Sequence, residues 1–217
     1  LTEGLTDEFK YGNMNYNAEC YIPNEISYGG IVLTPSYTDT YMGVWGSTYE
    51  EIRRVNEALA KLKGSSFDEA VKKQYEGELR FFRGMYYFEL LKRYGQAIIY
   101  DDDLSKISTN HALDKADDCW NFVYEDLLYA GQNLPNTTTN NGRLTGGAAY
   151  ALMSLAMLYF KNWKAVKEAA EAVSAMGYKL TGNYADAFKA SGNTEAIYMY
   201  SYSADASVTH DFDGYYA

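Results

Sequence analysis

The sequence predicts a mainly α-helical protein in which the helices pair as antiparallel hairpins. Hydrophobic residues make up 47% of the 217-residue chain, which is enough for a sizeable buried core. In five segments these residues recur at helical spacing, and residues that commonly begin or end helices separate the segments. We expect an irregular aromatic segment over residues 1–46, a helical scaffold over 47–190 and the start of a further region over 191–217.

Residues 1–46 combine aromatic residues with turn-forming ones. Asn, Gly and Thr are frequent, Pro23 and Pro35 interrupt the backbone, and no helical period is sustained. These residue types favour irregular backbone, whereas disordered tails rarely hold many aromatic side chains. The sequence therefore predicts an ordered but irregular segment, whose aromatic residues include Tyr11, Tyr16, Tyr21, Tyr28, Tyr37, Tyr41 and Trp45.

The first predicted hairpin joins a helix over 47–63 to a longer helix over 68–94. Both have the pattern of a capping box at their start, one at residues 47–50 and one at residues 66–69. Glycines follow both helices as stop residues, at positions 64 and 95. Helical spacing in the first helix is carried by Ile52, Val55, Leu59 and Leu62.

The second half of the longer helix, between Gly77 and Gly95, is aromatic on nearly every face. One apolar stripe holds Tyr75, Leu79, Phe82, Tyr86 and Leu90, and a second beside it holds Phe81, Met85 and Phe88. A helix that is apolar most of the way round is normally covered on more than one side. Arg80 and Arg83 interrupt this surface, and we expect them to reach carboxylates or carbonyls on neighbouring helices. The motif aromatics are predicted to pack in the core rather than to contact a ligand: Phe81, Phe82, Tyr86, Tyr87 and Phe88.

The second predicted hairpin joins helices over 117–134 and 145–161. Pro135 ends the first of these helices, and the polar run 136–142 is predicted to form a surface loop. Thr145 is expected to cap the second helix, because a hydroxyl before a helix accepts a bond from an early backbone N–H.

A fifth helix is expected from Trp163 to Val173, with Gly177 at its C-terminal end, and a short strand over residues 197–200. Each hairpin would bury one face only by stacking on the next, as in tetratricopeptide-like repeats. The spacing between hairpins exceeds the roughly 34 residues of that repeat. We therefore predict helical hairpins that repeat in the tetratricopeptide-like layout, with a degenerate form of the usual consensus.

The charge balance narrows the class of partner. With 19 Lys and Arg against 29 Asp and Glu, the net charge is −10, and nucleic acid is an unsuitable partner because phosphate binding needs clustered cations. No apolar run approaches the roughly 18 residues expected of a membrane-spanning helix. Cys20 and Cys119 lack metal-ligand spacing and are predicted to be small buried hydrophobic residues.

The sequence gives little support for catalysis. His111 and His210 lie in loop-like contexts without ligands at metal-binding spacing, and the sequence has no G-x-S-x-G, no H-E-x-x-H and no P-loop. Two acidic pairs, Glu50-Glu51 and Asp117-Asp118, are predicted in the first turns of helices, where carboxylates complement the helix dipole. Asp101-Asp102-Asp103 is predicted to form a solvated loop rather than a cation site. We therefore expect neither an enzyme nor a cofactor or metal.

Four groups of residues follow one another in a specific order over residues 45–200. They are Trp45-x3-Tyr49-x2-Ile52-x3-Asn56, the Gly77–Gly95 stretch, Asp126-Leu127 with Leu134-Pro135 before Gly142-Arg143-Leu144-Thr145, and Gly177-Tyr178-Lys179-Leu180 before Asn193-x-Glu195-x-Ile197-Tyr198. This series resembles the SusD/RagB family, the surface glycan-binding lipoproteins of Bacteroidetes. Three positions depart from the family pattern: Gly84 replaces its usual Ala, Ile98 its Pro and Gly146 its common Lys.

The resemblance implies a SusD-like α-α superhelix and a function without covalent chemistry. Such a protein captures an oligosaccharide or polysaccharide and delivers it to a SusC-like TonB-dependent transporter, docked through the helical scaffold. It also implies a surface-exposed location at the outer membrane, through a lipid anchor that this chain does not contain. Family members are usually about twice this long, so the chain resembles the middle of one.

The aromatic N-terminal segment is the better candidate for a glycan site. Sugars present C–H faces that pack against rings and hydroxyls that bond to polar side chains, and ligand sites commonly combine both surfaces. We predict these contacts from Asp7, Asn24, Glu25, Tyr28, Tyr37, Tyr41 and Trp45. Packing of the same rings onto the helices remains open.

Two other functions also remain open from the residues. One is a tetratricopeptide-type adaptor that binds a protein partner without sugar recognition. An aromatic-lined groove between hairpins would favour it. The other is a glycosidase, which requires two acids facing each other across a cleft. No acidic pair is placed in that way by the sequence.

Overall fold

The computed structural model describes residues 43–107, 111–137, 142–189 and 193–199. The chain divides into two compact units, Leu1–Ser47 and Thr48–Ala217. The helices of the described ranges are α3 (Trp45–Lys63), α4 (Glu69–Tyr94), α5 (Ala116–Asn133), α6 (Gly146–Phe160) and α7 (Trp163–Ala175), with short 3-10 turns η2 (Leu104–Lys106) and η3 (Tyr184–Phe188). The predicted mainly α-helical class is confirmed, and the three-way division of the chain stays a prediction.

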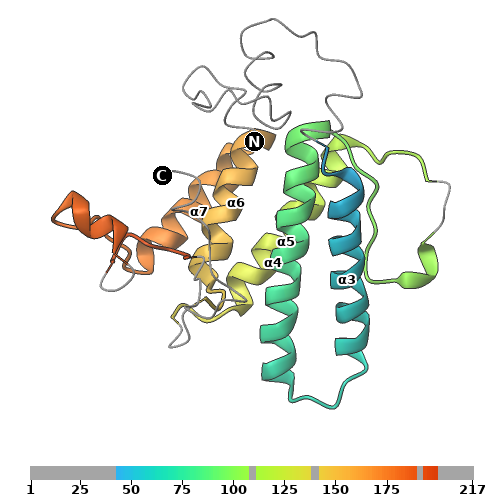
Figure 1. Ribbon diagram of the computed structural model, residues 1–217, viewed down its shortest axis with the longest axis horizontal. Coiled ribbons are helices and arrows are strands. Elements are labelled where there is room, and N and C mark those ends of the chain that lie inside the picture. The colour runs from blue at the N-terminus through green and yellow to red at the C-terminus, as the bar shows by residue number, and fades with distance from the viewer. Residues whose placement is uncertain (1–42, 108–110, 138–141, 190–192, 200–217) are drawn as a thin grey trace, which may run out of the picture. The chain divides into compact units, whose positions relative to one another are not determined.

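The helices pack in the order in which they follow along the chain. Figure 1 shows α3 and α4 side by side, joined at one end by a short connection. Next, α4 packs against α5, α5 against α6, and α6 against α7. Both predicted hairpins are therefore present, and each helix buries its apolar residues against its neighbours, as stacked helical hairpins must.

Local signals placed several helix ends correctly. Gly95 follows α4 with a φ of 77°, a conformation that favours glycine, and its N–H donates to the Leu91 carbonyl at 3.0 Å. Thr145 precedes α6, and its Oγ1 accepts a bond of 3.2 Å from the Ala148 N–H. Asp117 and Asp118 lie in the first turn of α5, as predicted.

The two predicted capping boxes are wrong. Helix α3 begins at Trp45, so Ser47 lies inside its first turn and donates its hydroxyl to the Val44 carbonyl at 3.2 Å. Glu50 and Glu51 consequently lie beyond the first turn. Helix α4 begins after Asp68, whose side chain makes no capping hydrogen bond. A capping box is recognised from local spacing alone, whereas the start of a helix also depends on how the preceding chain packs. Before α4, Phe67 packs against Tyr75, with ring centroids 6.0 Å apart.

The buried face of the long helix α4 differs from the first apolar stripe that the sequence predicted. Tyr75 is 40% exposed, and Leu79, Phe82 and Tyr86 are only half-buried. The buried line instead contains Gly77, Phe81, Arg83, Gly84, Tyr87, Phe88, Leu90 and Leu91. Of the motif aromatics, Phe81, Tyr87 and Phe88 are therefore core residues, as predicted, whereas Phe82 and Tyr86 are only partly so.

Two glycines explain why this line faces α5. A Cβ at Gly84 would lie 2.9 Å from Cγ of Leu127, and a Cβ at Gly77 would lie 3.1 Å from Cγ of Leu134. Because neither glycine has a side chain, α4 lies close against α5 along this line. Helical periodicity does not reveal that closeness.

Three further expectations can be checked in the described residues. Cys119 is buried, with its Sγ 3.6 Å from the Ala97 carbonyl oxygen, as expected of a small core residue. The expected strand is not observed: residues 197–199 have irregular backbone, and the described hydrogen bonds to the preceding chain lie at residues 193–195, such as Lys179 N–H to Thr194 O at 3.1 Å. No helix in the described ranges has the length and hydrophobicity needed to cross a membrane. Cys20, His210 and Tyr200 lie outside the described residues.

Candidate functional site

Only one of the predicted glycan-binding residues lies in the described part of the chain. Trp45 is the first residue of α3, and its side chain is half-buried. The others lie outside the described residues: Asp7, Asn24, Glu25, Tyr28, Tyr37 and Tyr41. The N-terminal site therefore stays a prediction.

The centre of the helical unit holds a buried ion pair between α4 and α5. Arg83 donates from Nε to Asp126 Oδ2 at 2.6 Å and from Nη2 to Asp126 Oδ1 at 2.8 Å. The two residues are 3% and 1% exposed, respectively. A bidentate pair of charged groups combines strength with a fixed geometry. The prediction that Arg83 reaches a carboxylate on a neighbouring helix is confirmed.

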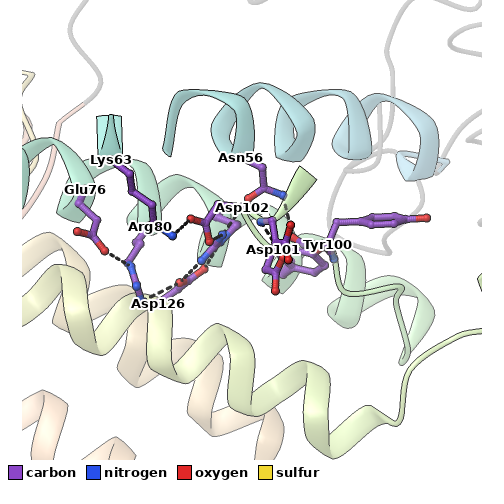
Figure 2. Close-up of polar contacts among 11 residues, drawn as sticks. Asn56, Lys63, Glu76, Arg80, Tyr100, Asp101, Asp102 and Asp126 are labelled. Carbon is purple, nitrogen blue, oxygen red and sulfur yellow. Dashed lines mark hydrogen bonds and ion pairs between the residues drawn. The ribbon is translucent and has the colours of Figure 1, made fainter. Parts of the chain in front are cut away.

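This pair is the centre of a wider network that ties α3 to the other two helices (Figure 2). The remaining guanidinium nitrogen, Nη1 of Arg83, donates to Asn56 Oδ1 at 2.8 Å, and Asn56 Nδ2 donates to the Tyr100 carbonyl at 2.8 Å. Arg80 pairs with Glu76 at 2.9 Å and lies 3.6 Å from Asp126. The network thus joins three helices and the chain that follows α4.

Asp102 corrects the prediction of a solvated acidic loop at residues 101–103. Its side chain is largely covered, forms an ion pair with Lys63, and lies 3.9 Å from Nη1 of Arg83. Burial works to raise the pKa of Asp102, but the hydrogen bond and charge of Lys63 lower it below its usual value. The acid is therefore a structural partner of α3 and α4.

Two tyrosine hydroxyls, from α3 and α4, hydrogen-bond to the backbone of the chain that follows α4. Tyr49 donates to the Ile98 carbonyl at 2.9 Å and accepts from the Ile98 N–H at 2.6 Å, while Tyr87 accepts from the Tyr100 N–H at 2.7 Å. Burial raises the pKa of Tyr49 to about 12 and also raises the pKa of Tyr87. Both hydroxyls therefore keep their protons at neutral pH.

The electrostatics of the network indicate a structural role. Burial raises the pKa of Asp126, and the bonds from Arg83 oppose that rise. Burial works to lower the pKa of Arg83, but Asp126 raises it, so the guanidinium stays charged. In the ranges that the structure describes, no group of three or more His, Cys, Asp or Glu side chains is arranged to hold a metal ion. His111 is exposed, with its ring 5.5 Å from that of Tyr100.

Among the described residues, two surface cavities of the helical unit are lined by more than one aromatic side chain. The first is an apolar groove of about 530 Å³ between α3 and α4, lined by Ala58, Lys61, Leu62, Ser65, Phe67, Tyr75, Glu78, Leu79 and Phe82. The second, of about 230 Å³, lies between the start of α6 and segment 193–199 and has a mixed polar and aromatic lining: Asn136, Thr137, Gly142, Arg143, Thr145, Tyr178, Ala196, Ile197, Tyr198 and Met199. Sequence reasoning missed the second cavity, because its residues come from three separate segments.

Comparison with known proteins identifies the family of this chain. Residues 6–158 match the model of a SusD-like family described as starch-binding and associating with the outer membrane. The chain belongs to the SusD-like family.

Related proteins support this membership in sequence and in fold. A SusD-like protein of Bacteroides ovatus is 26% identical over 167 residues, which is 70% of this chain and 30% of that relative. The crystal structure of a SusD-like protein from Bacteroides fragilis matches with a TM-score of 0.73 and 28% identity, over 83% of this chain and 37% of that one. A laminarin-binding SusD-like protein shares the fold, with a TM-score of 0.67 and 24% identity over 80% of this chain and 40% of that one. The chain thus spans about a third of the length of the relatives that it matches.

Two departures of this SusD-like chain from the expected family pattern have a physical explanation. The N–H of Ile98 donates to Tyr49, a bond that proline at this position would remove. A Cβ at Gly146 would lie 2.9 Å from the backbone oxygen of Gly131, so a lysine there would collide with α5. Both departures suit the close packing of this particular scaffold.

Proposed function

We propose that this chain is part of a surface-exposed outer-membrane lipoprotein that captures an oligosaccharide or polysaccharide and delivers it to a SusC-like TonB-dependent transporter. The observation that carries the proposal is the match of residues 6–158 to a SusD-like family described as starch-binding and associating with the outer membrane. The function consists of binding and release, without covalent chemistry.

The two carboxylates of the buried network are engaged in ion pairs. Its buried acid, Asp126, is held by two bonds from Arg83, and Asp102 is paired with Lys63. Neither carboxylate is available for the acid and base roles of glycoside hydrolysis, which requires two acids on either side of the scissile bond. The same bonds join α4 to α5 and α3 to the chain that follows α4, and a scaffold ordered in advance lowers the entropic cost of ordering a site that it carries.

The test is calorimetric titration of the full-length protein with a panel of glycans. The panel contains malto-oligosaccharides, because the family is described as starch-binding, and laminarin oligosaccharides, because a relative of the same fold binds laminarin. Xylogluco-oligosaccharides, present in another solved structure of the same fold, complete it. We expect saturable binding of one class without release of shorter sugars.

A matched pair of tryptophan variants tests the predicted N-terminal site. Trp45→Ala, alone and combined with Tyr37→Ala and Tyr41→Ala, should weaken binding. Trp163→Ala should leave binding unchanged, because Trp163 is a 63% exposed tryptophan at the start of α7 and lies outside the predicted site. If the folded full-length protein binds none of the glycans, or cleaves one of them, the proposal is wrong.

An apolar groove within the α3–α4 hairpin, rather than between two hairpins as expected of an adaptor, favours a second candidate, an adaptor that binds a protein partner. Phe67 and Tyr75 line it and are 53% and 40% exposed. Grooves with exposed aromatic side chains suit the apolar face of an amphipathic helix. Under this alternative, the full-length protein stays folded and binds none of the glycans.

A further inference from the structure

The cavity between the start of α6 and segment 193–199 has a lining that suits a sugar. We propose that it is a saccharide subsite, which binds one sugar residue of the captured glycan. This inference rests on the proposed function. It adds a contact with the glycan, made by residues outside the predicted N-terminal site. Its essential residues are Asn136, Thr137, Tyr178 and Tyr198.

The ring of Tyr178 is held against the first turn of α6. A Cβ at Gly147 would lie 2.5 Å from Oη of Tyr178 and 2.7 Å from its Cε2. Only a glycine at position 147 leaves room for the ring in this place. Tyr198, which is 43% exposed, lines the same cavity from segment 193–199. Two tyrosines thus contribute to one small cavity, and aromatic rings offer flat apolar faces with a polar group at the edge.

Hydrogen bonds hold the chain just before Tyr198 against residues 179–181. Lys179 and Thr194 exchange two bonds, from Lys179 N–H to Thr194 O at 3.1 Å and from Thr194 Oγ1 to Lys179 O at 2.9 Å. Glu195 Oε1 accepts from the Thr181 N–H at 2.7 Å. A wall ordered in advance reduces the entropic cost of binding.

The uncommitted polar groups of the cavity are neutral. Within the described residues, the side chains of Asn136, Thr137, Tyr178 and Tyr198 make no hydrogen bond. An amide and three hydroxyls therefore remain to donate to and accept from the hydroxyls of a sugar. The combination of rings with a few polar groups is typical of sites for small polar ligands.

An anion is a poorer fit, although the start of a helix and an arginine lie at the cavity. The Gly146 N–H donates to the Pro135 carbonyl at 3.0 Å, and the Ala148 N–H donates to Thr145 Oγ1 at 3.2 Å. Arg143 lies 2.7 Å from Oε1 of Glu78, which offsets its charge. Because these groups already have partners, the anion-binding capacity of the helix start is largely used.

The size of the cavity limits how much of a glycan it takes. Its volume of about 230 Å³ lies below the range of roughly 300–1,000 Å³ for pockets that enclose drug-sized ligands. A single sugar ring suits this space better than several linked rings do. The cavity therefore fits one terminal or branching residue of a longer glycan.

The test uses the full-length protein and the glycan that binds most tightly in the panel. Calorimetry compares wild type with Tyr198→Ala, Tyr198→Phe and Asn136→Ala. The control is Tyr184→Ala, which removes an 82% exposed tyrosine of η3 that does not line the cavity. Thermal unfolding of each variant is measured alongside.

We expect Tyr198→Ala to raise Kd by roughly two- to tenfold, the effect of losing one ring contact. Tyr198→Phe should retain most of the affinity, because the ring remains. Asn136→Ala should also raise Kd, whereas Tyr184→Ala should not change it.

The outcomes separate this inference from the proposed function. If wild type binds no glycan, the proposed function fails and the subsite fails with it. If wild type binds a glycan and all the cavity variants bind it equally well, only the subsite is overturned. A Tyr198→Ala variant with a lower unfolding temperature and an unchanged Kd would show that the tyrosine packs against protein, which also overturns the subsite.

Discussion

Replacing Asp126 with asparagine is the sharpest test of the buried network. The change keeps the size and shape of the side chain but removes the charge that two guanidinium nitrogens of Arg83 contact, at 2.6 and 2.8 Å. Arg83 is 3% exposed, so water cannot replace the lost partner. Asn56 remains as a neutral acceptor at 2.8 Å.

The expected loss of stability follows from these contacts. Breaking a buried ion pair by removing one partner typically costs about 3–5 kcal/mol, because a buried charge is left uncompensated. Stabilities of folded domains are about 5–15 kcal/mol, so the loss is a large fraction of the total. The assay is urea unfolding of the full-length protein, followed by far-UV circular dichroism.

A surface pair provides the matched control. Glu57→Gln makes the same carboxylate-to-amide change in the pair of Arg53 with Glu57, whose atoms are 2.8 Å apart and whose side chains are 60% and 37% exposed. This change should cost less than about 1 kcal/mol. An Asp126→Asn variant that is as stable as Glu57→Gln would refute the reasoning.

A double variant separates the buried charge from other effects of the substitution. Replacing Arg83 with methionine and Asp126 with leucine removes both charges and leaves apolar side chains in their place. Buried pairs replaced in this way are often neutral or stabilising. The double variant should therefore be more stable than Asp126→Asn, and a double variant that is less stable would contradict the explanation.

Two further predictions concern acid stability and helix contact. Lys63 lowers the pKa of Asp102 against the effect of burial, and Lys92 and Arg93 lower the pKa of Glu89 in the same way. The stability that these ion pairs contribute is therefore present above the unfolded-state pKa of about 4. It is lost as the pH falls through the lower folded-state pKa values. The urea midpoint should therefore decrease from pH 5 to pH 3, with a smaller decrease in Asp102→Asn; an equal decrease in both proteins would contradict this assignment. Gly146→Ala should destabilise the protein by roughly 1–3 kcal/mol, because its Cβ would meet the Gly131 backbone oxygen at 2.9 Å. Gly46→Ala is the control, because nothing lies within 4 Å of a Cβ at Gly46; it should be neutral or stabilise α3 by up to about 1 kcal/mol. Equal effects of the two substitutions in thermal unfolding would count against the close contact of Gly146 with the Gly131 backbone oxygen.

Local sequence patterns were sufficient for the helices and for the family. Apolar spacing is a property of each segment, so the helices were predicted nearly at their observed ranges. Gly95 and Thr145 were recognised because a helix end depends on a few neighbouring residues. The capping boxes failed at Ser47 and Ser66, where the chain before the helix also matters.

Contacts between distant segments depended on the tertiary structure. The sequence alone predicted that Arg83 would find an acidic or carbonyl partner, but only the packing of α4 on α5 selected Asp126, 43 residues away. The position of the chain after α4 beside the end of α3 made Asp102, expected to be a solvated acid, a partner of Lys63. The tertiary structure also brought Asn136, Tyr178 and Tyr198 from three segments to one cavity. Periodicity specifies which residues share a helix face, whereas the rotation and closeness of neighbouring helices decide which of those faces meet.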